Sequence, residues 1–217
     1  MRGNYAVFGL GSFGKTLAKE LSKGNNNVVV VDIDEQKVAE CREYVAEAIV
    51  ADVSNEEVIR ELNVKQYDAV VLGMSSHFEA LILAVTLLKQ EGVKKIYAKA
   101  STSIQGKILS RIGVDEVIQP EIDVAERLSL RLTMDNIQDM FKFKDYAIAE
   151  VGVPEEMQNK TLRELDVRNR YHITVLLIKK VNGPDEDIWS PDVVLEAEDV
   201  LTVFGSRRVI ESVFKRD

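Results

Sequence analysis

Three glycines near the start of the chain have the spacing of a nucleotide-binding loop. Gly9, Gly11 and Gly14 follow the apolar run 5–8 and precede a segment with helical spacing. In a Gly-x-Gly-x-x-Gly pattern between a strand and a helix, the first glycine permits a tight turn and the second lets the backbone approach a pyrophosphate. The third lets the helix pack closely on the strand, and the N–H groups at the helix start favour an anion. The pattern therefore predicts a loop that holds phosphate groups.

Asp32 is the residue expected to bind the sugar of the same nucleotide. It ends the second apolar run, 28–31, where a carboxylate accepts hydrogen bonds from ribose hydroxyls. A 2′-phosphate at that place would meet like charge. We therefore expect ATP/ADP or NAD/NADH as ligands, and not NADP.

The same loop also satisfies a second pattern. Residues 9–16 read Gly-x-x-x-x-Gly-Lys-Thr, the pattern of the phosphate loop of nucleoside triphosphatases. In that interpretation Lys15 would reach phosphate, and Asp52 or Asp68 would hold a metal ion. We favour the first interpretation, because the middle glycine and the acidic residue that ends the second strand have no role in the triphosphatase pattern. Lys15 is then an ordinary residue of the first helical turn.

The first 120 residues repeat one unit, a short apolar run followed by helical spacing. This alternation predicts a parallel sheet covered on both faces, a doubly wound, Rossmann-like α/β domain over 1–120. Two helices are expected to open at Ser-x-x-Glu capping boxes, at Ser54 and at Ser76. The expected strands are 5–8, 28–31, 48–51, 69–72, 96–98 and 116–118, and further helices are expected at 15–23, 35–44 and 103–112.

The pattern changes after Pro120. Residues 121–132 have helical spacing, and Ile137, Met140 and Phe141 continue it, so 121–144 is predicted to be a helical connector. Residues 145–217 are predicted to form a small α+β domain. Its expected features are strands at 146–153, 173–181 and 200–204, a capping box at Thr161–Glu164, a turn at Asn182–Gly183 and a last helix at 207–214.

Composition argues against several classes of protein. The 217 residues include 28 basic and 36 acidic residues, a net charge of −8, so no general basic footprint for nucleic acid is present. No apolar stretch approaches the roughly 20 residues that cross a bilayer, and a cytoplasmic protein is expected. Cys41, the sole cysteine, is predicted to be an apolar filler, and His77 and His172 to be structural. A dehydrogenase would need an acid or base beside a nicotinamide, and no good candidate stands out.

Longer segments of the chain resemble a known family. GLGSFG, VVVVDIDEQKV, RIGVDEVIQPE, TLRELDVRNRYHITVLLI and EDVLTVFG are similar, in this order, to the regulatory subunits of Ktr/Trk-type bacterial potassium uptake systems. Those subunits join an RCK N-terminal domain to an RCK C-terminal domain. The resemblance implies a protein without catalytic activity, whose homodimers assemble into a homo-octameric ring at the inner face of the cell membrane. Nucleotide exchange in the ring would gate a membrane potassium channel subunit. An NAD(H)-dependent oxidoreductase or an NAD-sensing binding protein is the alternative.

The resemblance also implies which residues contact the nucleotide. Ser12 and Phe13 would complete the phosphate loop, and Lys99 would reach a phosphate. Ser12 stands where many Ktr-type relatives have an arginine that can contact the terminal phosphate, which leaves both ATP/ADP and NAD/NADH open. Glu121 would face the nucleotide or a divalent cation such as Mg²⁺. Asp52 and Val53 would lie beside the adenine, and Gly73, Met74 and Ser75 would line the cleft.

A second ligand is implied for the C-terminal domain. Ktr-type relatives can bind cyclic di-AMP there through an Asp-x-Arg neighbourhood, in which a guanidinium suits phosphate and an apolar residue suits a purine. The matching positions of this chain are Asp166, Arg168, Asn169, His172 and Ile173. The alternative is a surface loop that caps a helix.

Overall fold

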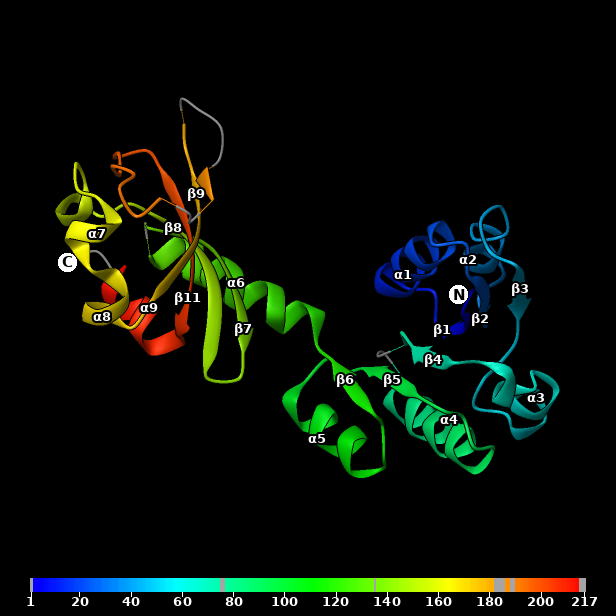
Figure 1. The fold of residues 1–217 in the computed structure, drawn as a ribbon. Helices are drawn as coiled ribbons and strands as arrows, with labels where there is room; N and C mark the ends of the chain where they lie inside the picture. The colour runs from blue at the N-terminus through cyan, green and yellow to red at the C-terminus, as the bar shows by residue number, and fades with distance from the viewer. Residues whose placement is uncertain (1, 75–76, 135, 182–185, 188–189, 215–217) are drawn as a thin grey trace. The chain divides into compact units, whose positions relative to one another are not determined.

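The computed structural model describes residues 2–74, 77–134, 136–181, 186–187 and 190–214. The chain divides into two compact units, Met1–Glu121 and Ile122–Asp217. Each unit has its own sheet and its own buried apolar residues (Figure 1).

The first unit is built on a parallel sheet of six strands in the order β3-β2-β1-β4-β5-β6. The strand order reverses at β1, which pairs with β2 on one side and with β4 on the other. At such a switch point the loops leave the carboxyl ends of the strands in opposite directions and open a crevice. This is the predicted doubly wound, Rossmann-like fold. The strands are β1 (Asn4–Phe8), β2 (Asn27–Asp32), β3 (Glu47–Val50), β4 (Ala69–Leu72), β5 (Ile96–Lys99) and β6 (Glu116–Ile118).

Helices cover both faces of this sheet, because its central strands are apolar at nearly every position. Phe8 of β1 packs in one core with residues of three helices, α3, α4 and α5. Its neighbour Val7 packs in the other core with α1 and α2. Cys41 is fully buried in the second core, as predicted. The helices are α1 (Ser12–Lys23), α2 (Glu35–Ala39), α3 (Glu56–Glu61), the 3-10 turn η1 (Val64–Gln66), α4 (Phe78–Gln90) and α5 (Ser103–Arg111).

Several helix boundaries differ from the sequence prediction, and two of the differences have a clear local cause. Helix α2 ends at Ala39 instead of 44, because the N–H groups of Cys41 and Arg42 bond to carbonyls three residues back and tighten the chain into turns. Helix α3 is capped by Asn55 and not by Ser54, whose hydroxyl donates to Asp52 instead. The predicted cap at Ser76 lies outside the described residues.

The second unit contains an antiparallel sheet of five strands in the order β10-β9-β11-β8-β7. Its first strand, β7, covers residues that the sequence analysis assigned to a helical connector, and that assignment is wrong. A bulge between Ile137 and Asp139 puts the next inward residue at Met140, three positions on, which imitates helical spacing. The strands are β7 (Ile137–Phe143), β8 (Tyr146–Gly152), β9 (Thr174–Lys179), β10 (Glu186–Asp187) and β11 (Val200–Ser206).

Among the described residues, four helices and one 3-10 turn belong to this part of the chain. Thr161 and Glu164 form the predicted capping box at the start of α7. The predicted turn at Asn182–Gly183 lies outside the described residues. Within the described part of the chain, no helix is both long enough and apolar enough to span a bilayer. The elements are α6 (Pro120–Thr133), η2 (Glu155–Met157), α7 (Leu162–Leu165), α8 (Val167–Tyr171) and α9 (Arg207–Val213).

Candidate functional site

The glycine loop between β1 and α1 is shaped by close backbone contacts. Gly9 has a φ of +91°, and a Cβ there would lie 2.6 Å from the backbone nitrogen of Met74. A Cβ on Gly14 would lie 2.0 Å from the carbonyl oxygen of Gly9, and one on Gly73 would lie 2.8 Å from the same atom. These three glycines therefore let β1, α1 and the end of β4 meet. Gly11 differs, because a Cβ on it would meet nothing within 4 Å.

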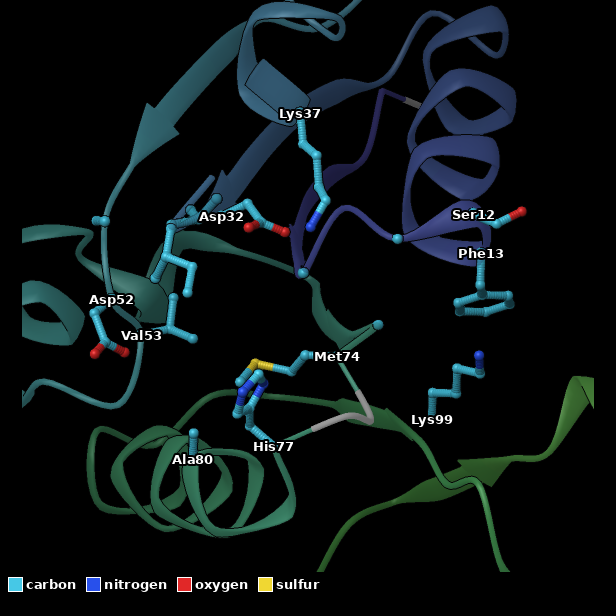
Figure 2. A pocket seen from close by; sticks show the side chains of 16 residues that line it. Ser12, Phe13, Asp32, Lys37, Asp52, Val53, Met74, His77, Ala80 and Lys99 are labelled. Carbon is cyan, nitrogen blue, oxygen red and sulfur yellow. The ribbon is translucent and has the colours of Figure 1, made fainter. Parts of the chain in front are cut away.

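A cavity of about 390 Å³ opens at this point, at the carboxyl ends of the strands (Figure 2). Gly11 borders it, and so do residues from β2, the loop after β3, the loop after β4 and the end of β5. Most of the predicted site residues of the first unit meet here. The lining residues are Gly9, Gly11, Ser12, Phe13, Val31, Asp32, Ile33, Lys37, Ala51, Asp52, Val53, Gly73, Met74, His77, Ala80 and Lys99.

Asp32 holds the glycine loop and also faces the cavity. One carboxylate oxygen accepts the N–H of Leu10 at 2.5 Å, and the other accepts the N–H of Asp34 at 2.9 Å. Each oxygen has a second lone pair, so the group can still accept bonds from hydroxyls of a ligand. The carboxylate thus fixes the loop in position and presents negative charge at the place predicted for a ribose.

The wall formed by the loop after β3 is acidic at one position and apolar at the next. Asp52 accepts hydrogen bonds from the hydroxyl of Ser54 at 2.7 Å and from its N–H at 2.9 Å, which lower the pKa of Asp52. Val53 is buried, whereas Ile33, after β2, is 66% exposed although it borders the cavity. An apolar side chain left open beside a cavity suits a flat, apolar ring such as a purine.

The opposite end of the cavity carries a positive charge at Lys99. Lys99 ends β5, and its ammonium lies 2.5 Å from a carboxylate oxygen of Glu121, the second residue of α6. This hydrogen bond lowers the pKa of Glu121. The Lys99 side chain is 13% exposed and borders the cavity with Phe13 (Figure 2), whereas Glu121 is not among the lining residues. Lys99, predicted to reach a phosphate, is therefore paired with Glu121, predicted to face the nucleotide or a divalent cation.

Two polar lining residues, Lys37 and His77, had no predicted role in binding. Lys37 comes from the first turn of α2, where its ammonium lies 3.3 Å from Asp34, and its side chain reaches toward the cavity (Figure 2). His77, which the sequence analysis read as structural, also borders the cavity at the start of α4. The sequence signal for Lys37 is its position five residues after Asp32, in the first turn of the helix expected to follow the sugar site.

The triphosphatase interpretation of the loop is not supported by the geometry. Lys15 forms an ion pair with Glu40 at 2.6 Å and is not among the residues that line the cavity. Asp68 directly precedes β4, at the amino-terminal edge of the sheet. There it accepts hydrogen bonds from the N–H of Asn4 and from the ammonium of Lys94. A metal ligand on Asp68 would therefore lie at the wrong edge.

The remaining predicted positions of the first unit are not among the lining residues. Ser75 lies outside the described residues, and Gly14 is buried beneath the loop. In the described part of the chain, no group of three or more His, Cys, Asp or Glu residues is arranged to hold a metal ion.

The positions implied for a second ligand surround α8. Asp166 and His172 both have left-handed backbones and flank this helix, and Asn169 donates to the Asp166 carboxylate at 2.8 Å. Arg168 is exposed, whereas Ile173 is fully buried in the core of the second unit. The polar groups thus lie near one another on the surface, and Ile173 contributes to packing.

Comparison with known proteins gives matches along nearly the whole chain. Residues 5–120 match the TrkA-N domain, and residues 146–216 match the TrkA-C domain. The Ktr system potassium uptake protein C of Bacillus subtilis (strain 168) is 33% identical over 219 residues, with 100% of this chain and 98% of the relative covered. The Ktr system potassium uptake protein A of Vibrio alginolyticus is 33% identical over 214 residues, with 97% and 96% covered.

Solved structures share the fold. The RCK domain of GsuK has a TM-score of 0.65 at 18% identity, covering 99% of this chain and 47% of that chain. The GsuK channel bound to NAD has a TM-score of 0.67 at 17% identity, covering 100% and 40%. The Kef CTD of Shewanella denitrificans in its AMP-bound form has a TM-score of 0.52 at 17% identity, covering 59% and 79%.

Proposed function

The chain belongs to the family of Ktr potassium uptake proteins built from a TrkA-N and a TrkA-C domain, and from this premise we propose that it gates a membrane potassium transporter in response to a bound nucleotide. It is a regulatory protein and not an enzyme. The transporter subunit is its membrane partner, and the place of action is the inner face of the membrane.

One observation carries the nucleotide part of the proposal. The cavity joins the open space above Gly11, at the N-terminus of α1, to the carboxylate of Asp32 at the end of β2. The helix N-terminus favours phosphate, and the carboxylate favours ribose hydroxyls. An adenine nucleotide has both groups. Structures of the GsuK channel bound to NAD and of GsuK bound to ADP support the same ligand class.

The lining residues fall into three groups, one for each part of an adenine nucleotide. Gly11, Ser12 and the first N–H groups of α1 would hold the phosphates, with Lys99 supplying the charge that the helix start lacks. Asp32 would hold the ribose, and Ile33 with Val53 would contact the adenine. An adenine nucleotide without a 2′-phosphate, such as ADP, ATP or NAD, fits this order of binding groups. The Asp32 carboxylate would repel the 2′-phosphate of NADP.

Gating requires that the ligand prefer one conformation of the assembly. A ligand with equal affinity for two states shifts no equilibrium, whatever its affinity. We propose that the copies form a ring, octameric as the resemblance implies, so that several coupling terms of about 1–3 kcal/mol each act on one partner. Divalent cations at Glu121 and cyclic di-AMP at the residues around α8 remain proposed additional ligands.

Calorimetric titration of the full chain with ATP, ADP, NAD, NADH, NADP and adenosine tests the site. We expect binding of ADP, ATP or NAD without turnover, and at least tenfold weaker binding of NADP. The matched variant is Asp32→Asn, which keeps an acceptor for the Leu10 N–H but lacks the charge, and which should bind NADP no worse than NAD. Potassium flux through the transporter, reconstituted with and without the chain, then tests gating. Flux that is identical with each nucleotide and with none would reject it.

A further inference from the structure

The sugar end of the cavity contains two groups with opposite effects on a ribose phosphate. The Asp32 carboxylate repels a phosphate on the 2′-hydroxyl. Lys37 also lines the cavity, and its side chain extends into it from α2 (Figure 2). In dinucleotide-binding folds, a basic residue near the sugar carboxylate can accommodate a 2′-phosphate. The presence of Asp32 alone therefore does not decide whether NADP is rejected.

Asp34 connects these two groups. Its N–H donates to a carboxylate oxygen of Asp32 at 2.9 Å, and one of its own carboxylate oxygens lies 3.3 Å from the ammonium of Lys37. A short chain of contacts thus runs from the carboxylate expected to bind ribose to the lysine. Asp34 itself is not among the lining residues, so it would act on a ligand through Lys37.

The two oxygens of the Asp34 carboxylate have different partners. Oδ1 accepts the N–H groups of Gln36 and Lys37, at 3.0 and 3.3 Å, and so caps helix α2. Oδ2 is the oxygen beside the Lys37 ammonium. The hydrogen bond from the Lys37 N–H, followed by that from its ammonium, lowers the pKa of Asp34, so this carboxylate is charged at neutral pH. The cap fixes the position of Asp34 and leaves its second oxygen for the lysine.

The charges at the sugar end are unequal. Two carboxylates, those of Asp32 and Asp34, accompany one ammonium, that of Lys37. A phosphate monoester carries about −1.5 to −2 charges at pH 7, so it would enter a site that is already negative. Lys15 does not correct this balance, because it is paired with Glu40 at 2.6 Å and does not line the cavity. Without the charge of Asp34, one carboxylate and one ammonium would remain, and the ammonium would be available to a phosphate.

We propose that Asp34 is a specificity-determining residue, which excludes nucleotides with a ribose 2′-phosphate by holding the Lys37 ammonium and by adding a second negative charge. This inference rests on the proposed nucleotide site. Lys37 is the group that would otherwise bind the 2′-phosphate. The ligands that remain are adenine nucleotides with a free 2′-hydroxyl on the adenosine ribose. Rejection of NADP is then shared between Asp32, which contacts the ribose, and Asp34, which acts through a lysine.

The size of the effect follows from the exposure of the pair. The side chains of Asp34 and Lys37 are both 42% exposed, and ion pairs of this kind change an equilibrium by no more than about fivefold. We therefore expect removal of the Asp34 charge to improve NADP binding severalfold, and not to convert the site into one that prefers NADP.

Calorimetric titration of the full chain and of Asp34→Asn with NAD and NADP tests the role of Asp34. Asparagine is as good a helix N-cap as aspartate, so the variant keeps the start of α2 and loses the charge. We expect the ratio of NADP affinity to NAD affinity to rise about threefold or more. Glu35→Gln removes the same charge from the next, exposed position and is the matched control. A smaller rise in Asp34→Asn, or an equal rise in the control, would overturn the proposal.

Lys37→Met tests whether Asp34 acts through the lysine. Methionine keeps an apolar stem and removes the ammonium. In this background, Asp34→Asn should change the ratio of NADP to NAD affinity by less than about twofold. A larger gain would show that the Asp34 charge repels phosphate without the lysine, and would overturn the role assigned to Lys37.

NAD and ADP distinguish the two levels of the argument. If the parent chain binds neither, the proposed nucleotide site is wrong. If NAD binds and the ratio of NADP to NAD affinity is the same in the parent chain and in Asp34→Asn, the nucleotide site stands and the role of Asp34 is wrong.

Discussion

At the scale of single residues, Gly11 and Gly14 are glycines for different physical reasons. Gly14 lies under the loop, where a Cβ would come within 2.0 Å of a backbone oxygen. Gly11 has an ordinary φ of −64° and open space around it, so the folded chain alone does not require a glycine there. The open space at Gly11 is where we propose that the ligand approaches the backbone.

Two alanine substitutions separate these roles. Gly11→Ala should cost less than about 1 kcal/mol of unfolding free energy, the usual range for a change at a helix N-cap. It should weaken ADP binding at least tenfold, because the added methyl occupies the space of the phosphates. Gly14→Ala should cost about 3 kcal/mol or more, because the atom it meets is backbone. Urea unfolding and calorimetry measure both, and unimpaired ADP binding by Gly11→Ala would contradict the assigned site.

Lys99 has two possible partners, the Glu121 carboxylate that it contacts and the phosphates of a nucleotide. If the two compete, Glu121→Gln should tighten ADP binding about two- to fivefold, since a partly exposed ion pair contributes less than about 1 kcal/mol. Adenosine, which has no phosphate, should bind the variant and the parent chain equally. Lys99→Met should weaken ADP binding about tenfold and leave adenosine unchanged.

The titrations are made without divalent cations, so that Glu121 acts only through Lys99. Weaker ADP binding by Glu121→Gln would show instead that the Glu121 carboxylate contacts the ligand directly. Glu121→Gln in the Lys99→Met background closes the cycle, because without the ammonium the removal of the Glu121 charge should no longer change ADP binding.

At the scale of elements, the strands of the first unit were predictable because they are nearly continuous apolar runs between clear turns. The glycine loop was predictable for the same reason, because a Gly-x-Gly-x-x-Gly pattern indicates a phosphate-binding loop only between a strand and a helix. Lys37 and His77 were missed because α2 and the start of α4 reach the cavity only through the order of strands in the sheet. Strand β7 was missed because its bulge gives inward residues a spacing of three.

The link between α6 and β7 depends on the charge of Asp139. Hydrogen bonds from Arg127 lower the pKa of Asp139, so its folded pKa lies below the unfolded value of about 4. Such a group stabilises the folded state above the unfolded pKa, and this contribution is lost as pH falls through the folded pKa. Asp139→Asn should therefore be less stable than the parent chain at pH 7, and the difference should shrink as pH falls below about 4 and through the lowered folded pKa.

Urea unfolding followed by circular dichroism measures this difference. Asp123→Asn, an exposed aspartate on α6, is the control and should show little difference at either pH. A difference for Asp139→Asn that persists unchanged at pH 3 would assign the effect to side-chain packing instead of charge.

At the scale of the whole molecule, the two units have separate cores and different folds. The two cores of the first unit are made of residues up to Val117, and the core of the second unit is made of residues from Leu130 onward. The division between a Rossmann-like unit and an α+β unit follows from the sequence, because the repeat of apolar run and helix stops at Pro120. Which face of the antiparallel sheet carries the core did not follow, because alternation on β7 and β8 shows which residues share a face but not which face is covered.

Separate expression of the units tests whether the nucleotide site is complete in the first. All residues that line the cavity lie between 9 and 99, so the fragment 1–121 should bind ADP with an affinity within about threefold of the full chain. The fragment 122–217 should fold, by its circular dichroism, and should not bind ADP. Gly11→Ala in the fragment 1–121 is the matched control, and it should lose affinity as it does in the full chain. If the fragment 1–121 folds but binds ADP much more weakly, then the second unit supplies part of the site, and the assignment of ligand recognition to the Rossmann-like unit alone is wrong.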